Sequence, residues 1–278
     1  MKIAFIGGGN MAAALIAGLA GKLTPGANIH VVDPNPASLE KLRQEYGVSV
    51  AAAAGEPVAA AEVLVLAVKP QVMHEVTQQL LPLLQAAQAA GRAPLVLSIA
   101  AGIRAADLAR WLGGYQSIVR TMPNTPALIG MGVTGMVASC GVSAGQRAAA
   151  DQILRAVGAT VWLDDEAKID AVTAVSGSGP AYVFYFIEAM QQAAQELGLS
   201  AEQGRELAMA TFSGAAQLAL QSTDPVAVLR EKVTSKGGTT YAALASMESS
   251  GVKASIICAV KAAAARGKEL GEQLGAAG

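Results

Sequence analysis

The chain has 278 residues, with 20 Lys and Arg against 21 Asp and Glu and a charged fraction of only 15%. At about 150 residues per domain, this length predicts two domains with a substantial core, which excludes a disordered chain or a small disulfide-rich scaffold. A net charge of −1 leaves no basic surplus for a phosphate backbone, so we expect no nucleic acid partner. Hydrophobic residues make up 53% of the chain, but no unbroken apolar stretch of about 20 residues exists, so we expect no membrane partner.

The ends and the reactive side chains indicate a protein of the cytoplasm. No charged leader or long apolar segment precedes the first apolar run at residues 3–6. Cys140 and Cys258 lie among Ala, Val and Ser without paired spacing, so we expect buried structural thiols. His30 and His74 have no acidic or cysteine neighbours at ligand spacing, so we predict no metal site.

The first part of the chain alternates short apolar runs with segments of helical spacing. The runs predict strands at residues 2–6, 28–33, 63–68, 95–100, 117–121, 132–138 and 160–163. Continuous β-branched runs such as 63–68 suit strands that are buried on both faces of a parallel sheet. Residues 36–46 and 71–84 carry apolar side chains at helical spacing and fit the crossovers between such strands. This rhythm predicts a doubly wound α/β sheet.

After residue 165 the pattern predicts only helices. Their expected ranges are 181–197, 200–220, a helix that begins at 224–225, 239–250 and 252–274. Ser200 with Gln203 has the spacing of a capping box, and Asp224 before Pro225 predicts an aspartate N-cap with proline at the first helical position. We therefore expect an α/β domain over residues 1–164 and an all-helical domain over residues 165–278.

The strongest motif opens the chain. Residues 7–12, Gly-Gly-Gly-Asn-Met-Ala, match G-x-G-x-x-A between a predicted strand and a predicted helix. Gly7 permits the tight turn, Gly9 lets the backbone approach a pyrophosphate, and Ala12 allows close packing of helix on strand. The phosphate then meets the helix N-terminus. The motif predicts a dinucleotide site, the alternative being a similar turn in an unrelated α/β protein.

Asp33 ends the second predicted strand, 26 residues after Gly7. This is close to the spacing of about 20 residues for the group that reads the adenosine ribose. The carboxylate would accept hydrogen bonds from the ribose diol and repel a 2′-phosphate, which favours NAD, whereas Asn35 could donate to such a phosphate. The alternative is that Asp33 only ends the strand and begins a turn with Pro34.

Three further loops follow predicted strands, at residues 67–70, 98–102 and 122–126. Ligands of doubly wound sheets bind at the edge where such loops meet. Lys69 could contact a ribose hydroxyl or phosphate, and Asn124 could hydrogen-bond a carboxamide or order a water. We expect these loops to extend the dinucleotide site.

Two motifs lie in the helical part. Residues 176–180, Ser-Gly-Ser-Gly-Pro, precede a long predicted helix and could face an anion or the reacting end of a cofactor. Residues 234–240, Thr-Ser-Lys-Gly-Gly-Thr-Thr, have the composition of an anion nest suited to a small carboxylate, the alternative being a polar turn. These motifs offer hydroxyls rather than a strong acid. A protonated imine needs less help from an acid than a ketone does, so they favour reduction of C=N over C=O.

Taken in this order and spacing, the motifs resemble the pyrroline-5-carboxylate reductase family over nearly the whole chain, and residues 233–240 are the most diagnostic. The resemblance implies a Rossmann-type sheet followed by a helical dimerisation domain. It also implies hydride transfer from a reduced nicotinamide to 1-pyrroline-5-carboxylate, giving L-proline. The partner implied is a second copy, in a homodimer or a larger ring such as a decamer, with the active site shared between chains.

The resemblance further assigns roles to individual residues. Thr240 would meet the ring nitrogen of the substrate, with Ser176 near the nicotinamide. The implied substrate residues are Ser235, Gly237, Gly238, Thr239 and Thr240. The implied cofactor residues are Gly7, Gly8, Gly9, Asn10, Met11, Asp33, Asn35, Ala67, Val68, Lys69, Pro70 and Asn124. Many members of the family prefer NADPH (NADP), whereas Asp33 indicates that NADH (NAD) is also possible here.

Two alternative functions remain at this point. A 3-hydroxyacid dehydrogenase of similar architecture would need a lysine on the helix after residue 180, and residues 181–197 contain none. A non-catalytic dinucleotide-binding protein would leave the hydroxyl-rich segment at 234–240 unexplained.

Overall fold

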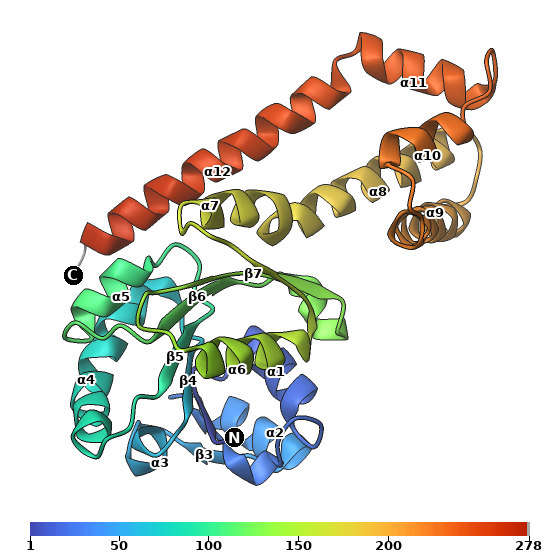
Figure 1. Cartoon of the computed structure of the whole chain (residues 1–278). Coiled ribbons are helices and arrows are strands. Elements are labelled where there is room, and N and C mark those ends of the chain that lie inside the picture. Colours follow the sequence, from blue (N-terminus) through green and yellow to red (C-terminus); the bar gives the residue numbers. More distant parts are fainter. Residues whose placement is uncertain (277–278) are drawn as a thin grey trace. The chain divides into compact units, whose positions relative to one another are not determined.

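The computed structural model describes residues 1–276, which form two compact units (Figure 1). Of the described residues, the first unit contains Met1–Ser178 and Ala263–Ala276, and the second contains Gly179–Ala262. Packing thus divides the chain after Ser178, whereas the sequence pattern changes near residue 165. The division into functional domains at residue 165 stays a prediction.

The first unit is built on an eight-stranded sheet. The strands are β1 (Ile3–Ile6), β2 (Ile29–Val32), β3 (Ser49–Ala51), β4 (Val63–Leu66), β5 (Leu95–Ser98), β6 (Ile118–Met122), β7 (Gly132–Ala138) and β8 (Gly158–Trp162). Their order is β3-β2-β1-β4-β5-β6-β7-β8, and every neighbouring pair is parallel except β6 with β7. The seven strands expected from the sequence are confirmed with small shifts at their ends, and β3 is additional. The sheet reverses its winding at β1, which makes the fold doubly wound as predicted.

Alternate residues of the strands supply a core on each face of the sheet. In β4, Val63 and Val65 join one apolar cluster while Leu64 and Leu66 join the other. One face is covered by α1 (Asn10–Leu19), α2 (Pro36–Tyr46) and α6 (Ala144–Arg155), and the other by α3 (Glu56–Ala59), α4 (Met73–Ala89) and α5 (Ala105–Trp111). Because both faces are buried, a ligand of this sheet can bind only along its edges.

Short helices occupy several of the connections. They are η1 (Gly26–Asn28), η2 (Pro70–Val72), η3 (Thr125–Ile129), α7 (Lys168–Val172) and η4 (Thr173–Gly177). The last of these is a single π-helical turn. Such turns are rare and often lie at functional sites.

The second unit is entirely helical. It contains α8 (Gly179–Glu196), α9 (Ala201–Gln221), α10 (Val226–Lys232), α11 (Thr239–Ser249) and the first part of α12 (Val252–Ala276). The capping box is confirmed, because the Gln203 N–H donates to Ser200 Oγ at 3.1 Å and the Ser200 N–H donates to Gln203 Oε1 at 2.9 Å. The aspartate cap is wrong: Pro225 is the N-cap of α10, and the Asp224 carboxylate instead pairs with Lys232.

The expectation of buried cysteines is also wrong. Cys140 and Cys258 are both exposed. Cys140 follows β7 in a loop, and Cys258 lies on an exposed stretch of α12. Apolar neighbours in the sequence therefore do not by themselves predict that a residue is buried.

Within the described residues, no single helix is both long and apolar enough to cross a membrane. Helices α11 and α12 meet that test only when they are taken together, and a bend of 54° separates them.

Candidate functional site

The carboxyl ends of β1, β2, β4, β5 and β6 lie along one edge of the sheet, because these strands are parallel. Gly7 follows β1, Asp33 follows β2, Ala67 follows β4 and Asn124 follows β6. The structure therefore brings the motifs of the first domain together at a single edge. This is where ligands of doubly wound sheets bind.

Gly7 makes the tight turn that leaves β1. Its φ is +104°, and a Cβ at this position would lie 2.6 Å from the carbonyl oxygen of Ala67. The Gly7 N–H donates to Val32 O at 2.8 Å, which continues the ladder to β2. Only glycine fits this backbone and this approach.

Gly9 is the N-cap of α1, and a Cβ built there would meet no atom within 4 Å. The first helical bond of α1 runs from the Ala13 N–H to Gly9 O, so the N–H groups at residues 10–12 precede it. Gly9 and Asn10 are exposed. An open cradle beside a helix N-terminus fits a pyrophosphate.

Asp33 ties the loops after β1 and β2 together. Its Oδ2 accepts from the Gly8 N–H at 2.7 Å, and its Oδ1 accepts from the Asn35 N–H at 2.8 Å. The Ser38 hydroxyl adds a second link between these two parts of the chain by donating to Gly8 O at 3.2 Å. The turn after the strand exists, but the bond to Gly8 shows that Asp33 does more than end β2.

Asn35 caps helix α2. Its Oδ1 accepts from the Ala37 N–H at 3.0 Å, while Pro36 fills the first helical position and Gly47 ends the helix at φ +64°. The oxygen of this exposed side chain is thus engaged inside the loop, and its Nδ2 group is the donor that a ribose or phosphate would meet. Lys69, exposed at the start of η2, adds a positive charge after β4.

Asn124 and Ser176 contact each other across 52 residues of sequence. Asn124 Nδ2 donates to the backbone oxygen of Ser176 at 3.2 Å, and its Oδ1 accepts from the Val133 N–H at 2.9 Å. The Ser176 hydroxyl donates to Val172 O at 3.0 Å. The structure therefore places the π turn η4, which carries Ser176, beside the end of β6. No local pattern around either residue predicts this contact.

The segment at residues 234–240 lies in the second unit and leads into α11. Gly237 adopts φ +74°, and the Gly238 N–H donates to Ser235 O at 3.0 Å, so the chain turns tightly before the helix. Thr239 and Thr240 occupy the first turn of α11, where the N–H groups precede the first helical bond, from Ala242 to Gly238 O. Backbone N–H groups and hydroxyls in this arrangement suit a small carboxylate.

Sequence reasoning missed Arg120, which lies in β6 with a side chain only 4% exposed. It pairs with Glu166 at 2.8 Å and with Asp170 at 4.0 Å. Glu166, in the turn before α7, also accepts from the Ala105 N–H at 2.7 Å, so one carboxylate links this turn to both α5 and β6. An arginine inside an apolar strand run was the signal that could have revealed this pair, because a buried charge requires a partner.

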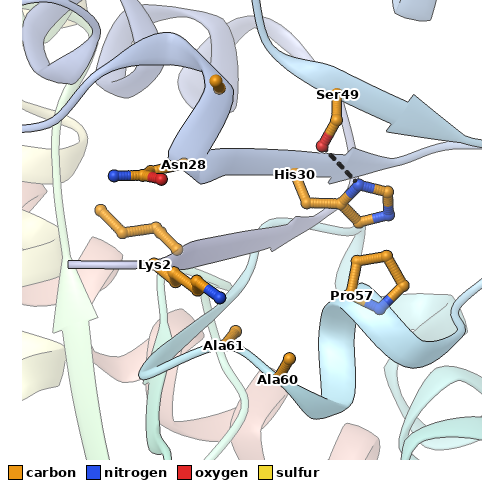
Figure 2. A pocket seen from close by; sticks show the side chains of 9 residues that line it. Lys2, Asn28, His30, Ser49, Pro57, Ala60 and Ala61 are labelled. Atoms are coloured by element: carbon orange, nitrogen blue, oxygen red, sulfur yellow. Dashed lines mark hydrogen bonds between the residues drawn. The ribbon is translucent and has the colours of Figure 1, made fainter.

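His30 lies at the opposite ends of the strands and lines a cavity of about 170 Å³ with Lys2, Asn28, Ser49 and Pro57 (Figure 2). Its Nδ1 is 2.8 Å from Ser49 Oγ. Burial lowers the pKa of this imidazole below its usual value. Among residues 1–276, no group of three His, Cys, Asp or Glu side chains converges as a metal site.

Comparison with known proteins agrees with this geometry. A family model described as pyrroline-5-carboxylate reductase dimerisation matches residues 166–270, and one described as NADP oxidoreductase coenzyme F420-dependent matches residues 2–102. The pyrroline-5-carboxylate reductase of Pseudomonas aeruginosa is 50% identical over 274 residues, covering 99% of this chain and 98% of the relative. The Haemophilus influenzae enzyme of the same name is 43% identical over 96% of this chain and 97% of the relative. The chain belongs to the pyrroline-5-carboxylate reductase family.

Solved structures of the family share the fold of this chain. A pyrroline-5-carboxylate reductase from Coxiella burnetii has a TM-score of 0.90 at 38% identity and covers 97% of this chain and 98% of its own. The Plasmodium falciparum pyrroline carboxylate reductase, solved with NADP bound, has a TM-score of 0.84 at 28% identity and 98% coverage of both chains. The predicted fold class is confirmed. The match to the dimerisation model supports a homo-oligomer.

Proposed function

We propose that this chain reduces the C=N bond of 1-pyrroline-5-carboxylate to L-proline with a reduced nicotinamide dinucleotide. The observation that carries the proposal is the geometry of the glycine loop. The loop leaves open space at Gly9, and the Asp33 carboxylate fixes it by accepting from the Gly8 N–H. The relatives named pyrroline-5-carboxylate reductase support the choice of substrate.

The residues at the carboxyl edge of the sheet fit the dinucleotide. Its pyrophosphate lies at the N-terminus of α1, its ribose beside Asp33 and Asn35, and its nicotinamide half towards Lys69 and Asn124. The full set is Gly7, Gly8, Gly9, Asn10, Met11, Asp33, Asn35, Ala67, Val68, Lys69, Pro70 and Asn124. When bound, the reduced coenzyme supplies a hydride. NADPH and NADH are both candidates, since a family structure holds NADP while Asp33 carries a negative charge.

The segment before α11 holds the substrate. Its carboxylate accepts hydrogen bonds from the N–H groups and hydroxyls of Ser235, Gly237, Gly238, Thr239 and Thr240. Thr240 orients the imine nitrogen with its hydroxyl. A protonated imine already carries the charge that attracts hydride, so the protein needs to orient it rather than supply a strong acid. Ser176 lies on the coenzyme side.

The assembly completes the site. The dimer brings the Ser235 to Thr240 segment of a second copy to the coenzyme of the first, and dimers build a larger ring such as a decamer. We place the enzyme in the cytoplasm, where its substrate and coenzyme are small soluble molecules.

The test is the loss of near-ultraviolet absorbance of NADH or NADPH on mixing with purified protein and 1-pyrroline-5-carboxylate. We expect imine-dependent oxidation and stoichiometric formation of proline. Coenzyme binding without oxidation would overturn the proposal, and oxidation of a 3-hydroxy acid with NAD or NADP would replace it with the dehydrogenase alternative.

A further inference from the structure

The side chain of Asn124 is 9% exposed and joins three elements of the first unit. It leaves the end of β6, donates to Ser176 O in η4 at 3.2 Å and accepts from the Val133 N–H in β7 at 2.9 Å. One donor and one acceptor of the amide are thus engaged with backbone. A buried amide satisfied in this way rigidifies the groups that it joins.

The backbone oxygen of Ser176 has a reason to need this donor. In a continuing α-helix this oxygen would accept from the N–H of the residue four positions later in the chain. That residue is Pro180, which has no backbone N–H. The chain forms a π turn here, closed by the Ser178 N–H to Thr173 O at 2.8 Å. Asn124 therefore supplies the donor that the proline removes.

A second contact shows how closely η4 approaches the end of β6. A Cβ on Gly177 would lie 2.6 Å from the terminal carbon of Met122. Gly177 thus lies against the end of the Met122 side chain, and the hydrogen bond from Asn124 fixes the register of the turn. The position of Ser176 at the coenzyme edge is set by these two contacts with β6.

We propose that Asn124 is a positioning residue for the reaction, which acts by holding the Ser176 turn against the end of β6. This inference rests on the proposed function. The turn carries Ser176, which we place on the coenzyme side, so a shift of the turn displaces the groups around the reacting carbon. A misplacement of about 1 Å can cost about 100-fold in rate.

The test replaces the amide by its isostere in Asn124→Asp. An ionised carboxylate can still accept from the Val133 N–H but repels Ser176 O, whereas a protonated carboxyl again offers one donor and one acceptor. We expect kcat to fall about 10- to 100-fold at pH near 8. The ratio of variant to wild-type kcat should rise as the pH is lowered, because burial raises the pKa of the introduced carboxyl into the range of the assay.

Asn28→Asp is the matched control. Asn28 is half-buried in the same unit, and its Nδ2 donates to Thr24 Oγ1 at 3.3 Å. This variant should keep the wild-type kcat and pH profile. The Kd of the coenzyme, measured by fluorescence, should change less than about threefold in Asn28→Asp, and melting curves at each pH report the folded fraction of both variants.

If Asn124→Asp does not fold, Asn124→Ser provides the second test, with a lower kcat at every pH. A variant with wild-type kcat, or a deficit that does not respond to pH in a folded Asn124→Asp, would overturn the role of Asn124. A wild-type chain that oxidises neither coenzyme would overturn the proposed function instead, so the two failures are distinguishable.

Discussion

The Asp33 carboxylate accepts a hydrogen bond from the backbone N–H of Gly8 at 2.7 Å, so the end of β2 holds the loop that follows β1. The same carboxylate carries the negative charge beside the proposed ribose site. Loop geometry and coenzyme choice therefore depend on one side chain.

Asp33→Asn should shift the preference towards NADPH. The amide retains an oxygen for one of the two N–H groups but removes the charge that repels a 2′-phosphate. We expect the ratio of Kd values, NADPH over NADH, to fall about 10-fold, which corresponds to about 1.4 kcal/mol. Fluorescence titration with each coenzyme measures it.

Glu45→Gln is the control for this charge change. Glu45 is exposed on α2 and pairs with Lys41 at 3.9 Å, away from the end of β2. Glu45→Gln should leave the ratio of the NADPH and NADH Kd values unchanged. An equal shift of both Kd values in Asp33→Asn would mean that the loop was disturbed and the charge is not the selector.

Gly9→Ala and Gly7→Ala should separate binding from folding. A methyl group on Gly9 meets nothing in the protein, so stability should change by less than about 1 kcal/mol while the coenzyme Kd rises about 10-fold or more. A methyl group on Gly7 meets Ala67 O at φ +104°, which should cost about 2 kcal/mol or more of unfolding free energy. Urea denaturation and titration distinguish the two. A coenzyme Kd unchanged in Gly9→Ala would contradict the pyrophosphate cradle.

Thr240→Ala should lower kcat about 10- to 100-fold, because it removes the hydroxyl that orients the imine nitrogen. The coenzyme Kd should stay within about twofold, since the loop binds the substrate and not the dinucleotide. Thr240→Ser, which keeps the hydroxyl, should recover most of the rate. Equal loss of coenzyme affinity in Thr240→Ala would place this segment at a different site.

His30 should make the stability of the fold sensitive to acid. Burial lowers the pKa of His30 in the folded chain, while the unfolded chain takes up the proton below about pH 6.5. Its contribution is therefore present above that pH and is lost as the pH falls. Urea denaturation between about pH 7 and pH 5 measures how steeply the free energy of unfolding falls as the pH is lowered. This slope should be smaller in His30→Asn than in the wild type, by at most about 1.4 kcal/mol per pH unit. Identical slopes in the two proteins would refute the assignment.

Local signals predicted much of this fold. The range of α2 follows from Pro36 at its start and Gly47 at its end, and the capping box of α9 follows from Ser200 and Gln203. These elements are set by chemistry within a few residues. Strand β3, by contrast, has only three residues and leads into an alanine-rich stretch without the β-branched run of the other strands, so pairing with β2 creates it.

The sequence predicted which loops lie at the carboxyl edge of the sheet, but not the contacts between their residues. Asp33 reaches Gly8 because β1 and β2 are neighbours in the sheet. Asn124 reaches Ser176 because the chain returns to the end of β6 after 52 residues. Arg120 was overlooked for the same reason, because its partners Glu166 and Asp170 come from the turn before α7 and from α7 itself, and not from its own strand. The periodicity of apolar residues predicts which face of an element is buried, but it does not predict which other element packs against that face.

The last turns of α12 belong to the first unit. Arg110 donates to Gly275 O at 2.6 Å, and Leu274 packs against the core beneath α5. On the ribosome these residues emerge only after all of Gly179–Ala262 has been made. The first unit thus lacks part of its packing until synthesis is nearly complete. A gene fragment that stops at residue 178 would yield this unit without the contacts that α12 makes with α5 and its core.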